Sequence, residues 1–292
     1  MRNTPFRKRL SACVYFFSAL LALGFVAANS TVNGADNIQA TGIDTGSPWP
    51  NGAEVAVVLT YDDALDSHLD TAIPQLNKLG LPGTFYLSGA RPAIRMRLNE
   101  WRQAADQGHE LGNHTLYHPC RKSVAGRDWV KPWQDLDNYT LDQFVEEVKT
   151  TNSMLEAIDG EKQRTFAYPC GDMQAGDEDV LPALKKLVSG ARLYSEDGQH
   201  QPENDDYYRV ASFDGAEKSA EQLIAVAEAA RKNNSLVGFM FHGVGGDYIT
   251  VSSEAHQQLL EHLAAHPERY WVATMREAIA HLKRSQQLLN SD

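Results

Sequence analysis

Short β-rich runs alternate with helical stretches from residue 54 to residue 288, and this alternation constrains the fold more than any other feature of the chain. Strands that alternate with helices form βα units around a mainly parallel sheet. The pattern predicts an α/β fold, a distorted (β/α) barrel of about seven units in a single domain over residues 51–290. The expected strands are Glu54–Tyr61, Gly83–Leu87, Glu110–Asn113, Thr165–Tyr168, Ala191–Tyr194, Tyr208–Ala211, Leu236–His242 and Tyr270–Thr274. The expected helices are Leu65–Leu79, Ile94–Gln107, Leu141–Ile158, Asp179–Val188, Ala220–Lys232, Ser253–Ala265 and Met275–Leu288.

Residues 1–30 are predicted to be a secretory signal peptide rather than part of the fold. Basic residues precede an apolar run from about Leu10 to Ala28, and small residues follow it, which indicates cleavage near residues 28–35. An uncleaved membrane anchor is the alternative, because the run is nearly long enough to span a bilayer. Residues 31–50 are polar and aperiodic, so we expect a flexible lead-in. The protein is therefore expected to be secreted or periplasmic, with no membrane association once the signal is removed.

The mature chain is strongly acidic. The segment to residue 35 carries four positive charges and no negative ones, so its removal takes the formal net charge from −11 to −15. Such a chain is a poor partner for nucleic acid or anionic membranes. The charge also disfavours a strongly anionic polymer as substrate, and the sequence does not indicate an oligomeric state.

Polar side chains gather where several of the expected strands end. Asp62 and Asp63 close the first strand, His114 follows the third, and His242 ends a late one. Because sites in parallel α/β folds form at the carboxyl ends of strands, these side chains are expected to meet at one rim. His118 lies four residues after His114, so one helical turn would place both imidazoles on one face.

One carboxylate and two imidazoles form a typical ligand set for a catalytic metal. Zn²⁺ fits this set best, and Co²⁺, Mn²⁺, Ni²⁺ or Fe²⁺ are alternatives. Three protein ligands leave one position open for water or substrate, and the second aspartate remains available as a base. The pattern therefore points to metal-assisted hydrolysis.

Two cysteines remain in the mature chain, because Cys13 lies in the signal. An even pair in an oxidising compartment predicts a disulfide between Cys120 and Cys170. This bond would pin the loop Pro119–Tyr139, which carries Trp129 and Trp133. Those rings either stack on sugar faces or pack the loop onto the barrel, and the sequence leaves both alternatives open.

Four motifs occur in an order that resembles the polysaccharide deacetylases, the NodB-homology or family 4 carbohydrate esterases. They are Thr60–Asp63, His114–His118, Phe166–Gly171 and Met240–His242, and the resemblance covers roughly residues 53–285. It implies a distorted (β/α) barrel and hydrolytic removal of acetyl groups from sugars. The implied roles are a base for Asp62, metal ligands for Asp63, His114 and His118, a general acid for His242, an oxyanion-binding backbone N–H for Cys170, and a place beside that slot for Tyr168.

The chain also departs from the family pattern. The usual glycine after the acidic pair is Ala64, and the usual arginine that pairs with the base is Ala167. Arg164 lies three residues before that slot and is expected to point elsewhere. The Asp-Trp motif that normally supports the acid histidine has no clear copy, and the loose candidates are Asp197, Asp205 and Asp206.

These observations predict a secreted, metal-dependent carbohydrate deacetylase that acts on acetylated poly- or oligosaccharides. N-acetyl groups of GlcNAc-type glycans are the first choice, and O-acetyl esters such as those of xylan are the alternative. A catalytically impaired carbohydrate-binding protein on the same scaffold is a rival, motivated by Ala64, Ala167 and the missing support for His242. A metal hydrolase acting on a cyclic imide or a non-sugar amide is another.

Overall fold

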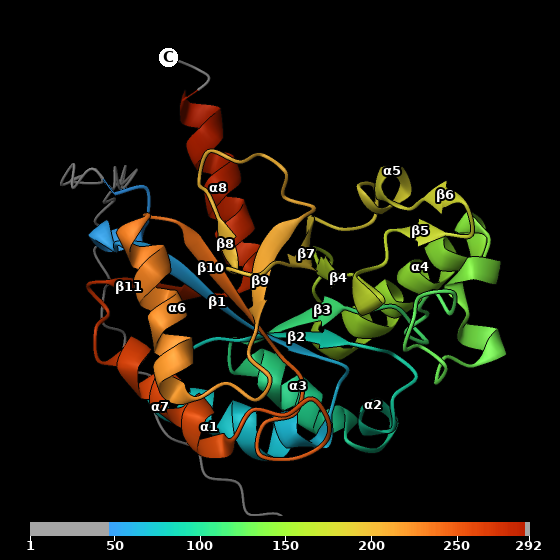
Figure 1. Cartoon of the computed structure of the whole chain (residues 1–292), viewed down its shortest axis with the longest axis horizontal. Coiled ribbons are helices and arrows are strands. Elements are labelled where there is room, and N and C mark those ends of the chain that lie inside the picture. The colour runs from blue at the N-terminus through green and yellow to red at the C-terminus, as the bar shows by residue number, and fades with distance from the viewer. Residues whose placement is uncertain (1–46, 290–292) are drawn as a thin grey trace, which may run out of the picture. The chain divides into compact units, whose positions relative to one another are not determined.

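The computed structural model describes residues 47–289, and these residues contain a closed barrel of parallel strands (Figure 1). Seven strands pair in the order β1-β2-β3-β4-β7-β9-β10, and β10 pairs back to β1 to close the ring. The expected distorted (β/α) barrel is therefore confirmed. The barrel strands are β1 (Val55–Asp62), β2 (Thr84–Leu87), β3 (Glu110–Asn113), β4 (Thr165–Ala167), β7 (Gly190–Tyr194), β9 (Val210–Asp214) and β10 (Leu236–Phe241).

The barrel is distorted because β1 is longer than its neighbours. One edge of β1 pairs with β10, while its other edge is divided between two strands. Its amino-terminal half pairs with β11 (Tyr270–Ala273), and its carboxyl-terminal half pairs with β2. The seam between β3 and β4 is short, with only Asn113 opposite Phe166. A short antiparallel strand, β8 (Gln199–His200), extends β10 outside the ring, and β5 (Gln174–Ala175) and β6 (Glu178–Asp179) form a separate hairpin.

Helices cover the outside of the barrel. Two of them begin with a full capping box, α4 at Thr140 and α6 at Ser219, which fixes their starts. The expected helix Ile94–Gln107 is split into two, because Arg97 leaves helical geometry between them. The expected helix Asp179–Val188 shrinks to one turn. The helices are α1 (Ile73–Leu79), α2 (Pro92–Met96), α3 (Leu98–Asp106), α4 (Leu141–Asp159), α5 (Leu181–Leu184), α6 (Ala220–Lys232), α7 (Ser253–Ala264) and α8 (Met275–Leu289).

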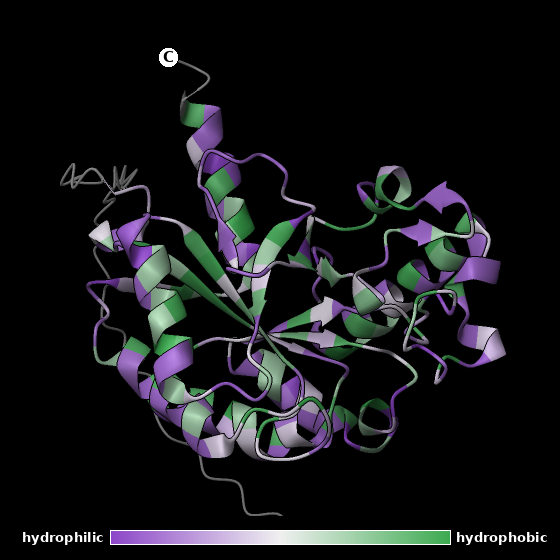
Figure 2. Ribbon diagram, viewed as in Figure 1, coloured by the Kyte–Doolittle hydropathy of each residue, from purple (hydrophilic) through white to green (hydrophobic). Residues whose placement is uncertain are grey.

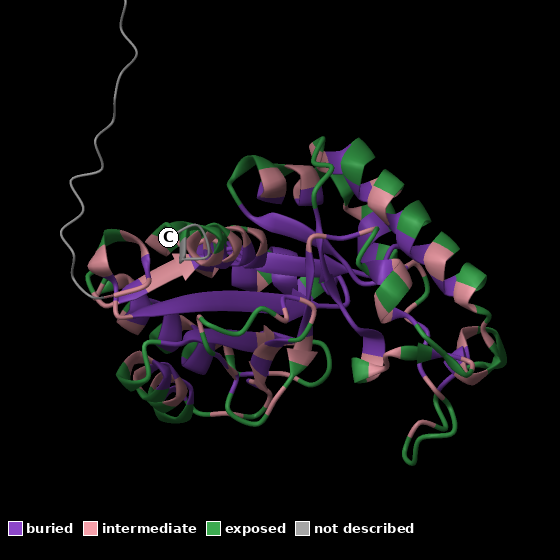
Figure 3. Cartoon of the chain, turned by 90° about the horizontal axis from the view of Figure 1, so that it is seen from above, coloured by how far each residue is buried: buried purple, intermediate pink, exposed green. Residues whose placement is uncertain are grey.

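Apolar side chains concentrate on the strands and on the helix faces that turn toward them (Figure 2). Every residue of β1 is buried, as expected for a strand covered on both faces. Figure 3 shows the same pattern, with buried strands at the centre and exposure on the outer helix surfaces. Tyr61 stacks on Phe85 and Phe241, which ties β1, β2 and β10 into one cluster.

The packed structure begins before residue 51. Trp49 falls in the expected flexible lead-in, but it is buried, stacks on Trp271 and contacts His281 of α8. An indole of this size gains enough from burial to order the short segment around it. Residues 31–46 and the expected signal peptide lie outside the described residues. Within residues 47–289, no helix has the length and apolar character needed to cross a membrane.

Candidate active site

Asp62 and Asp63 both face one pocket because the backbone turns sharply where β1 ends. Asp62 is the last residue of the strand, and Asp63 and Ala64 have φ angles of 83° and 55°. Regular alternation would send the two carboxylates to opposite faces, and the left-handed turn removes that constraint. It also explains why glycine suits position 64, since alanine is less favourable at positive φ.

The three predicted metal ligands converge in the structure. Asp63 Oδ1 lies 3.6 Å from His114 Nε2 and 3.4 Å from His118 Nε2. Nitrogen and oxygen atoms bound tetrahedrally to Zn²⁺ at about 2.0–2.1 Å stand about 3.3–3.4 Å apart, so this spacing fits a zinc ion. Asp63 Oδ1 is buried and accepts no hydrogen bond, although Arg91 Nη2 lies 3.2 Å away. A buried carboxylate oxygen without a donor is the arrangement expected of a metal ligand.

His114 and His118 meet through a loop and not through a helical turn, so that expectation was wrong. Thr115 and His118 have φ angles of 62° and 56°, which break helical geometry. The loop's N–H groups bond to side chains instead: His118 N donates to Thr115 Oγ1, and Tyr117 N donates to Glu147. The ring centroids of the two histidines still lie 4.8 Å apart.

Burial keeps both histidines neutral, as metal ligands must be. It lowers the pKa of His114 to about 4, and it also lowers the pKa of His118. Burial alone would raise the pKa of Asp63, but His118, His114 and Arg91 together hold it well below the ordinary range. His114 donates its Nδ1 proton to Ala167 O at 2.8 Å, which leaves Nε2 as the ligand atom.

Asp62 forms a buried ion pair with Arg192 that the sequence analysis missed. Arg192 on β7 crosses the barrel interior, donates to Asp62 Oδ2 from Nη2, and donates to Ser212 Oγ at 3.1 Å. Burial would raise the pKa of Asp62, but Arg192, His114 and His242 outweigh it and lower that pKa. The other oxygen, Oδ1, is buried and accepts no hydrogen bond.

Arg192 lies next to position 167, where the family pattern usually has an arginine and this chain has alanine. Ala167 on β4 lies directly opposite Arg192 on β7 in the parallel register. Paired positions share one face of a sheet, so the guanidinium enters the space that alanine leaves free. A lone arginine in the apolar run Gly190–Leu193 was the available signal, because arginine is rarely buried without a partner.

His242 follows β10 and reaches the same pocket, with its Nδ1 buried and without a hydrogen-bond partner. His68 Nε2 donates to the carbonyl of His242 at 2.8 Å, and Val244 N donates to Ser67 Oγ at 3.2 Å. These bonds join the segment after β1 to the segment after β10. Asp214 at the end of β9 lines the pocket with His242, whereas the candidate supports Asp197, Asp205 and Asp206 do not.

The pocket has a volume of about 900 Å³ and contains most of the predicted site residues. Tyr168 lies in its wall, with its hydroxyl donated to Tyr208 O at 3.1 Å. Trp129 also lines it, is half exposed, and lies 6.4 Å from His118 between ring centroids. Apolar lining comes from Leu193, Met240 and Ile249.

Trp133 lies outside this pocket. It packs edge-to-face on Tyr117 with centroids 5.5 Å apart, and both rings are exposed in a neighbouring hollow beside α4. Tyr139 OH donates to Trp133 O and to Glu147, so the backbone below this aromatic pair is anchored. The two tryptophans of the loop therefore occupy different places.

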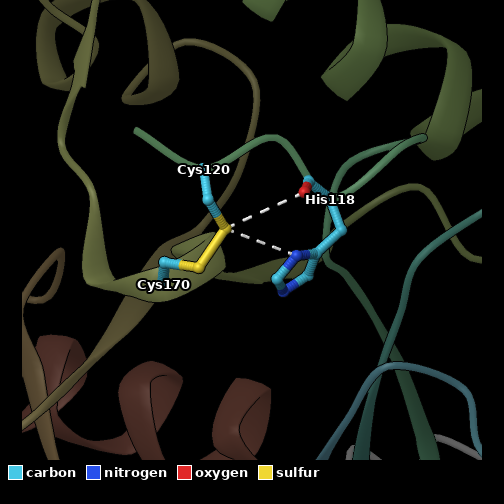
Figure 4. Close-up of side chains that lie close together, drawn as sticks. All are labelled: His118, Cys120 and Cys170. Carbon is cyan, nitrogen blue, oxygen red and sulfur yellow. Dashed lines mark hydrogen bonds between the residues drawn. A yellow bond between two sulfur atoms is a disulfide. The ribbon is translucent and has the colours of Figure 1, made fainter. Parts of the chain in front are cut away.

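The predicted disulfide between Cys120 and Cys170 is present, with the Cα atoms 5.8 Å apart (Figure 4). Cys170 has a φ of 57° in the turn after β4 and lines the pocket. Arg127 donates to Cys170 O at 2.9 Å and pairs with Asp172 at 2.5 Å. The disulfide and Arg127 together hold the segment that carries the predicted oxyanion donor.

Tyr248 and Arg91 are further pocket residues that the sequence analysis missed. Tyr248 OH donates to Asp63 Oδ2 at 2.5 Å, and the Arg91 guanidinium lies 5.8 Å from the Tyr248 ring centroid. Together they contact both oxygens of the predicted metal ligand, Tyr248 at Oδ2 and Arg91 at Oδ1. The glycines after His242 were the signal in the sequence that this loop turns back toward the pocket. A Cβ at Gly243 would lie 2.0 Å from Gly246 O, so the loop folds back on itself.

Curated relatives match only part of this chain. An uncharacterized protein of Bacillus subtilis, YlxY, is 27% identical over 115 residues, which are 39% of this chain and 31% of that protein. The B. subtilis peptidoglycan-N-acetylmuramic acid deacetylase PdaA is 25% identical over 138 residues, 47% of this chain and 45% of that protein. The chain thus spans less than half the length of either relative.

Solved structures share the fold. A candidate polysaccharide deacetylase from Mycobacterium smegmatis superposes with a TM-score of 0.58 at 17% identity, covering 82% of this chain and 93% of that one. The peptidoglycan deacetylase PdaC of B. subtilis gives a TM-score of 0.52 at 16% identity, with 80% and 94% covered. At these identities the likeness concerns the fold alone.

The family model for polysaccharide deacetylases matches residues 50–188. This segment carries the acidic pair, both predicted histidine ligands and the turn at Cys170, while Arg192 and His242 follow it. The resemblance to the polysaccharide deacetylases is therefore confirmed for residues 50–188, which match that family's model.

Proposed function

We propose that this protein is a metal-dependent carbohydrate deacetylase that hydrolyses acetyl groups of poly- or oligosaccharides, with N-acetyl groups of GlcNAc-type glycans as its substrate. One observation carries the proposal. Asp63, His114 and His118 converge beside a second carboxylate, Asp62, whose Oδ1 is buried and free of hydrogen bonds. A ligand set and an unengaged base at one pocket are what hydrolysis of an acetyl group needs.

Asp63, His114 and His118 would hold the metal ion, and Zn²⁺ suits this ligand set. When bound, a divalent ion supplies Lewis-acid polarisation of water and of the acetyl carbonyl. Tyr248 and Arg91 orient Asp63 from the outer side through its carboxylate oxygens. His114 is oriented by its bond to Ala167 O.

Asp62 acts as the base. Its Oδ1 takes a proton from the attacking water, while Arg192 holds Oδ2 and keeps the carboxylate ionised. The backbone N–H of Cys170 donates to the oxygen that becomes negative in the tetrahedral intermediate, a contribution of about 3–4 kcal/mol for such donors. His242 then gives a proton to the departing amine or alkoxide.

The side chains around the reacting centre suit a sugar ring. Trp129 offers a half-exposed indole face in the pocket, and Leu193, Met240 and Ile249 add apolar surface that an acetyl methyl or a pyranose face can contact. We propose an exported protein, because residues 1–30 resemble a signal and the disulfide suits an oxidising compartment.

Three alternatives are separated by experiment. The carbohydrate-binding scaffold was motivated by Ala167, and Arg192 beside it supplies the missing guanidinium, which weakens that motive. O-acetyl esterase activity uses the same groups, since His242 can protonate an alkoxide as well as an amine. A metal hydrolase of non-sugar amides would not need Trp129.

The test is acetate release by the purified mature chain from chitin oligosaccharides, acetylated xylan and peptidoglycan fragments, each with chelator and with Zn²⁺ or Co²⁺ restored. We expect metal-dependent acetate from the chitin oligosaccharides. Acetate from xylan alone would assign the O-acetyl activity. No acetate from any substrate, with metal still bound, would favour the binding scaffold or the non-sugar hydrolase.

A further inference from the structure

The two predicted metal histidines are oriented by different acceptors. His114 Nδ1 bonds to a backbone carbonyl, Ala167 O, at 2.8 Å. His118 Nδ1 instead faces Cys120 Sγ of the disulfide at 3.5 Å, and that sulfur also lies 3.9 Å from His118 O (Figure 4). A proton on Nδ1 of His118 that points at the sulfur leaves Nε2 free to bind the metal. The sulfur thus orients His118 as the carbonyl of Ala167 orients His114.

The disulfide also joins two strained segments of the site. His118 and Cys170 have φ angles of 56° and 57°, and left-handed geometry is unfavourable for a non-glycine residue. Such conformations persist only where the surrounding structure enforces them. The bond from Cys120 to Cys170 connects the segment that carries His118 with the turn that carries the predicted oxyanion donor.

We propose that the Cys120–Cys170 disulfide is a support of the metal site, and that its reduction weakens metal binding through His118. The inference rests on the proposed function, because it takes Asp63, His114 and His118 as the ligands. The disulfide therefore makes the site redox-sensitive as well as stabilising the loop.

The reduction can proceed from the pocket. Cys120 is buried, whereas Cys170 is partly exposed and lines the pocket, so a dithiol reductant attacks the sulfur of Cys170. The S–S bond breaks and Cys120 leaves as a thiolate that takes up a proton. The second thiol of the reductant then releases Cys170 as a thiol, so the protein gains two electrons and two protons while the reductant becomes a disulfide.

Reduction would also create a competing ligand set. A ring nitrogen of His118 and the sulfurs of Cys120 and Cys170 all lie within 4.8 Å of one another. Freed thiols could therefore bind Zn²⁺ themselves, since thiolate is a preferred zinc ligand. A variant that lacks both sulfurs loses the support of His118 but cannot bind Zn²⁺ through thiols, so it separates the two effects.

The test compares Zn²⁺ affinity, measured by competition with a chromophoric chelator, for the oxidised wild type, the double variant C120A/C170A and D172N. Loss of a partner that orients a metal-bound histidine typically weakens affinity about 10–100-fold, and we expect this for C120A/C170A. D172N is the matched control, because it loosens the same loop at Arg127 and Arg121 without touching the sulfurs. Its affinity should stay close to that of the wild type.

Two outcomes would overturn the inference: equal affinity in C120A/C170A and wild type, or an equal loss in D172N. If the double variant does not fold, the folded wild type is loaded with Co²⁺ and treated with a dithiol. Loss of the Co²⁺ bands without new thiolate-to-cobalt charge-transfer absorption supports the inference. Unchanged bands with both thiols titratable, or new charge-transfer absorption that replaces the bands, contradict it. Failure of the oxidised wild type to bind metal at all would instead overturn the metal site of the proposed function.

Discussion

Two buried arginine–carboxylate pairs lie in different parts of the barrel and differ in what they leave unpaired. Arg164, just before β4, donates to both oxygens of Asp159 at 2.6 and 2.9 Å and to Leu111 O at 2.7 Å. Arg192, within β7, engages only one oxygen of Asp62, at the carboxyl end of β1. The side chains of both pairs are almost fully buried.

The difference separates a structural pair from a reactive one. Asp159 has no unused oxygen, because its Oδ1 also accepts from Glu161 N. Among the described residues, the only buried carboxylate oxygens without a hydrogen bond belong to Asp62 and Asp63. Buried acceptors are normally satisfied, so the two exceptions mark where a proton or a metal ion is meant to bind.

The largest expected effect comes from removing the unpaired acceptor. D62N should lower kcat by about 10²–10⁴-fold, because an amide cannot accept the proton of the attacking water. Zn²⁺ and oligosaccharide affinity should persist, as measured by chelator competition and calorimetry. D159N is the matched control and should keep its kcat. An equal fall in kcat for both variants would remove the distinction between the two pairs.

D159N should instead lower the free energy of unfolding by about 3–5 kcal/mol, because it leaves the buried Arg164 guanidinium without its carboxylate. Denaturant unfolding measures this loss. A D159N protein as stable as the wild type would show that the Arg164 pair contributes nothing net to the fold.

Arg192 is expected to set the pH range of the reaction. It lowers the pKa of Asp62 against the effect of burial, so R192M should raise that pKa. Activity requires ionised Asp62, so it is lost as pH falls through this pKa. The acid limb of kcat/KM should therefore move to higher pH in R192M. R164M should leave the limb in place. An unshifted acid limb in a folded R192M would assign Arg192 a structural role only.

Trp129 should show a smaller effect, confined to substrate binding. W129A should raise KM for chitin oligosaccharides by about 2- to 10-fold, the size of a stacking contact worth about 0.5–1.5 kcal/mol. KM for a small acetyl ester should not change. A purely structural role for the indole predicts lower thermal stability with KM unchanged.

Trp133 is expected to have the smallest effect, because it lies outside the pocket that contains Asp62, Asp63 and His242. W133A should leave KM for short oligosaccharides unchanged and raise it only for chains long enough to reach the neighbouring hollow. Measuring KM against chain length checks this. A rise for the shortest substrate would place Trp133 at the reacting centre.

The sequence predicts most of the strands and helices closely, since α6 and β3 begin and end where expected. It also predicts the positions of Asp62, Asp63, His114 and His242, because polar groups after apolar strands meet at one rim. The helical turn from His114 to His118 was wrong, because Glu147 and Thr115 bind the loop's N–H groups and prevent it. Spacing along the chain cannot report such competition from distant side chains.

The sequence by itself determined the barrel, the chemistry available at its rim and the pairing of the two cysteines of the mature chain. Each depends on local periodicity, strand ends or a count of residues. Only the tertiary structure decided that Arg192 rather than Arg164 pairs with Asp62, that Tyr248 bonds to Asp63, and that the disulfide sulfur faces His118. These contacts join strands and loops far apart in the chain, and they follow from register and backbone turns that no local pattern encodes.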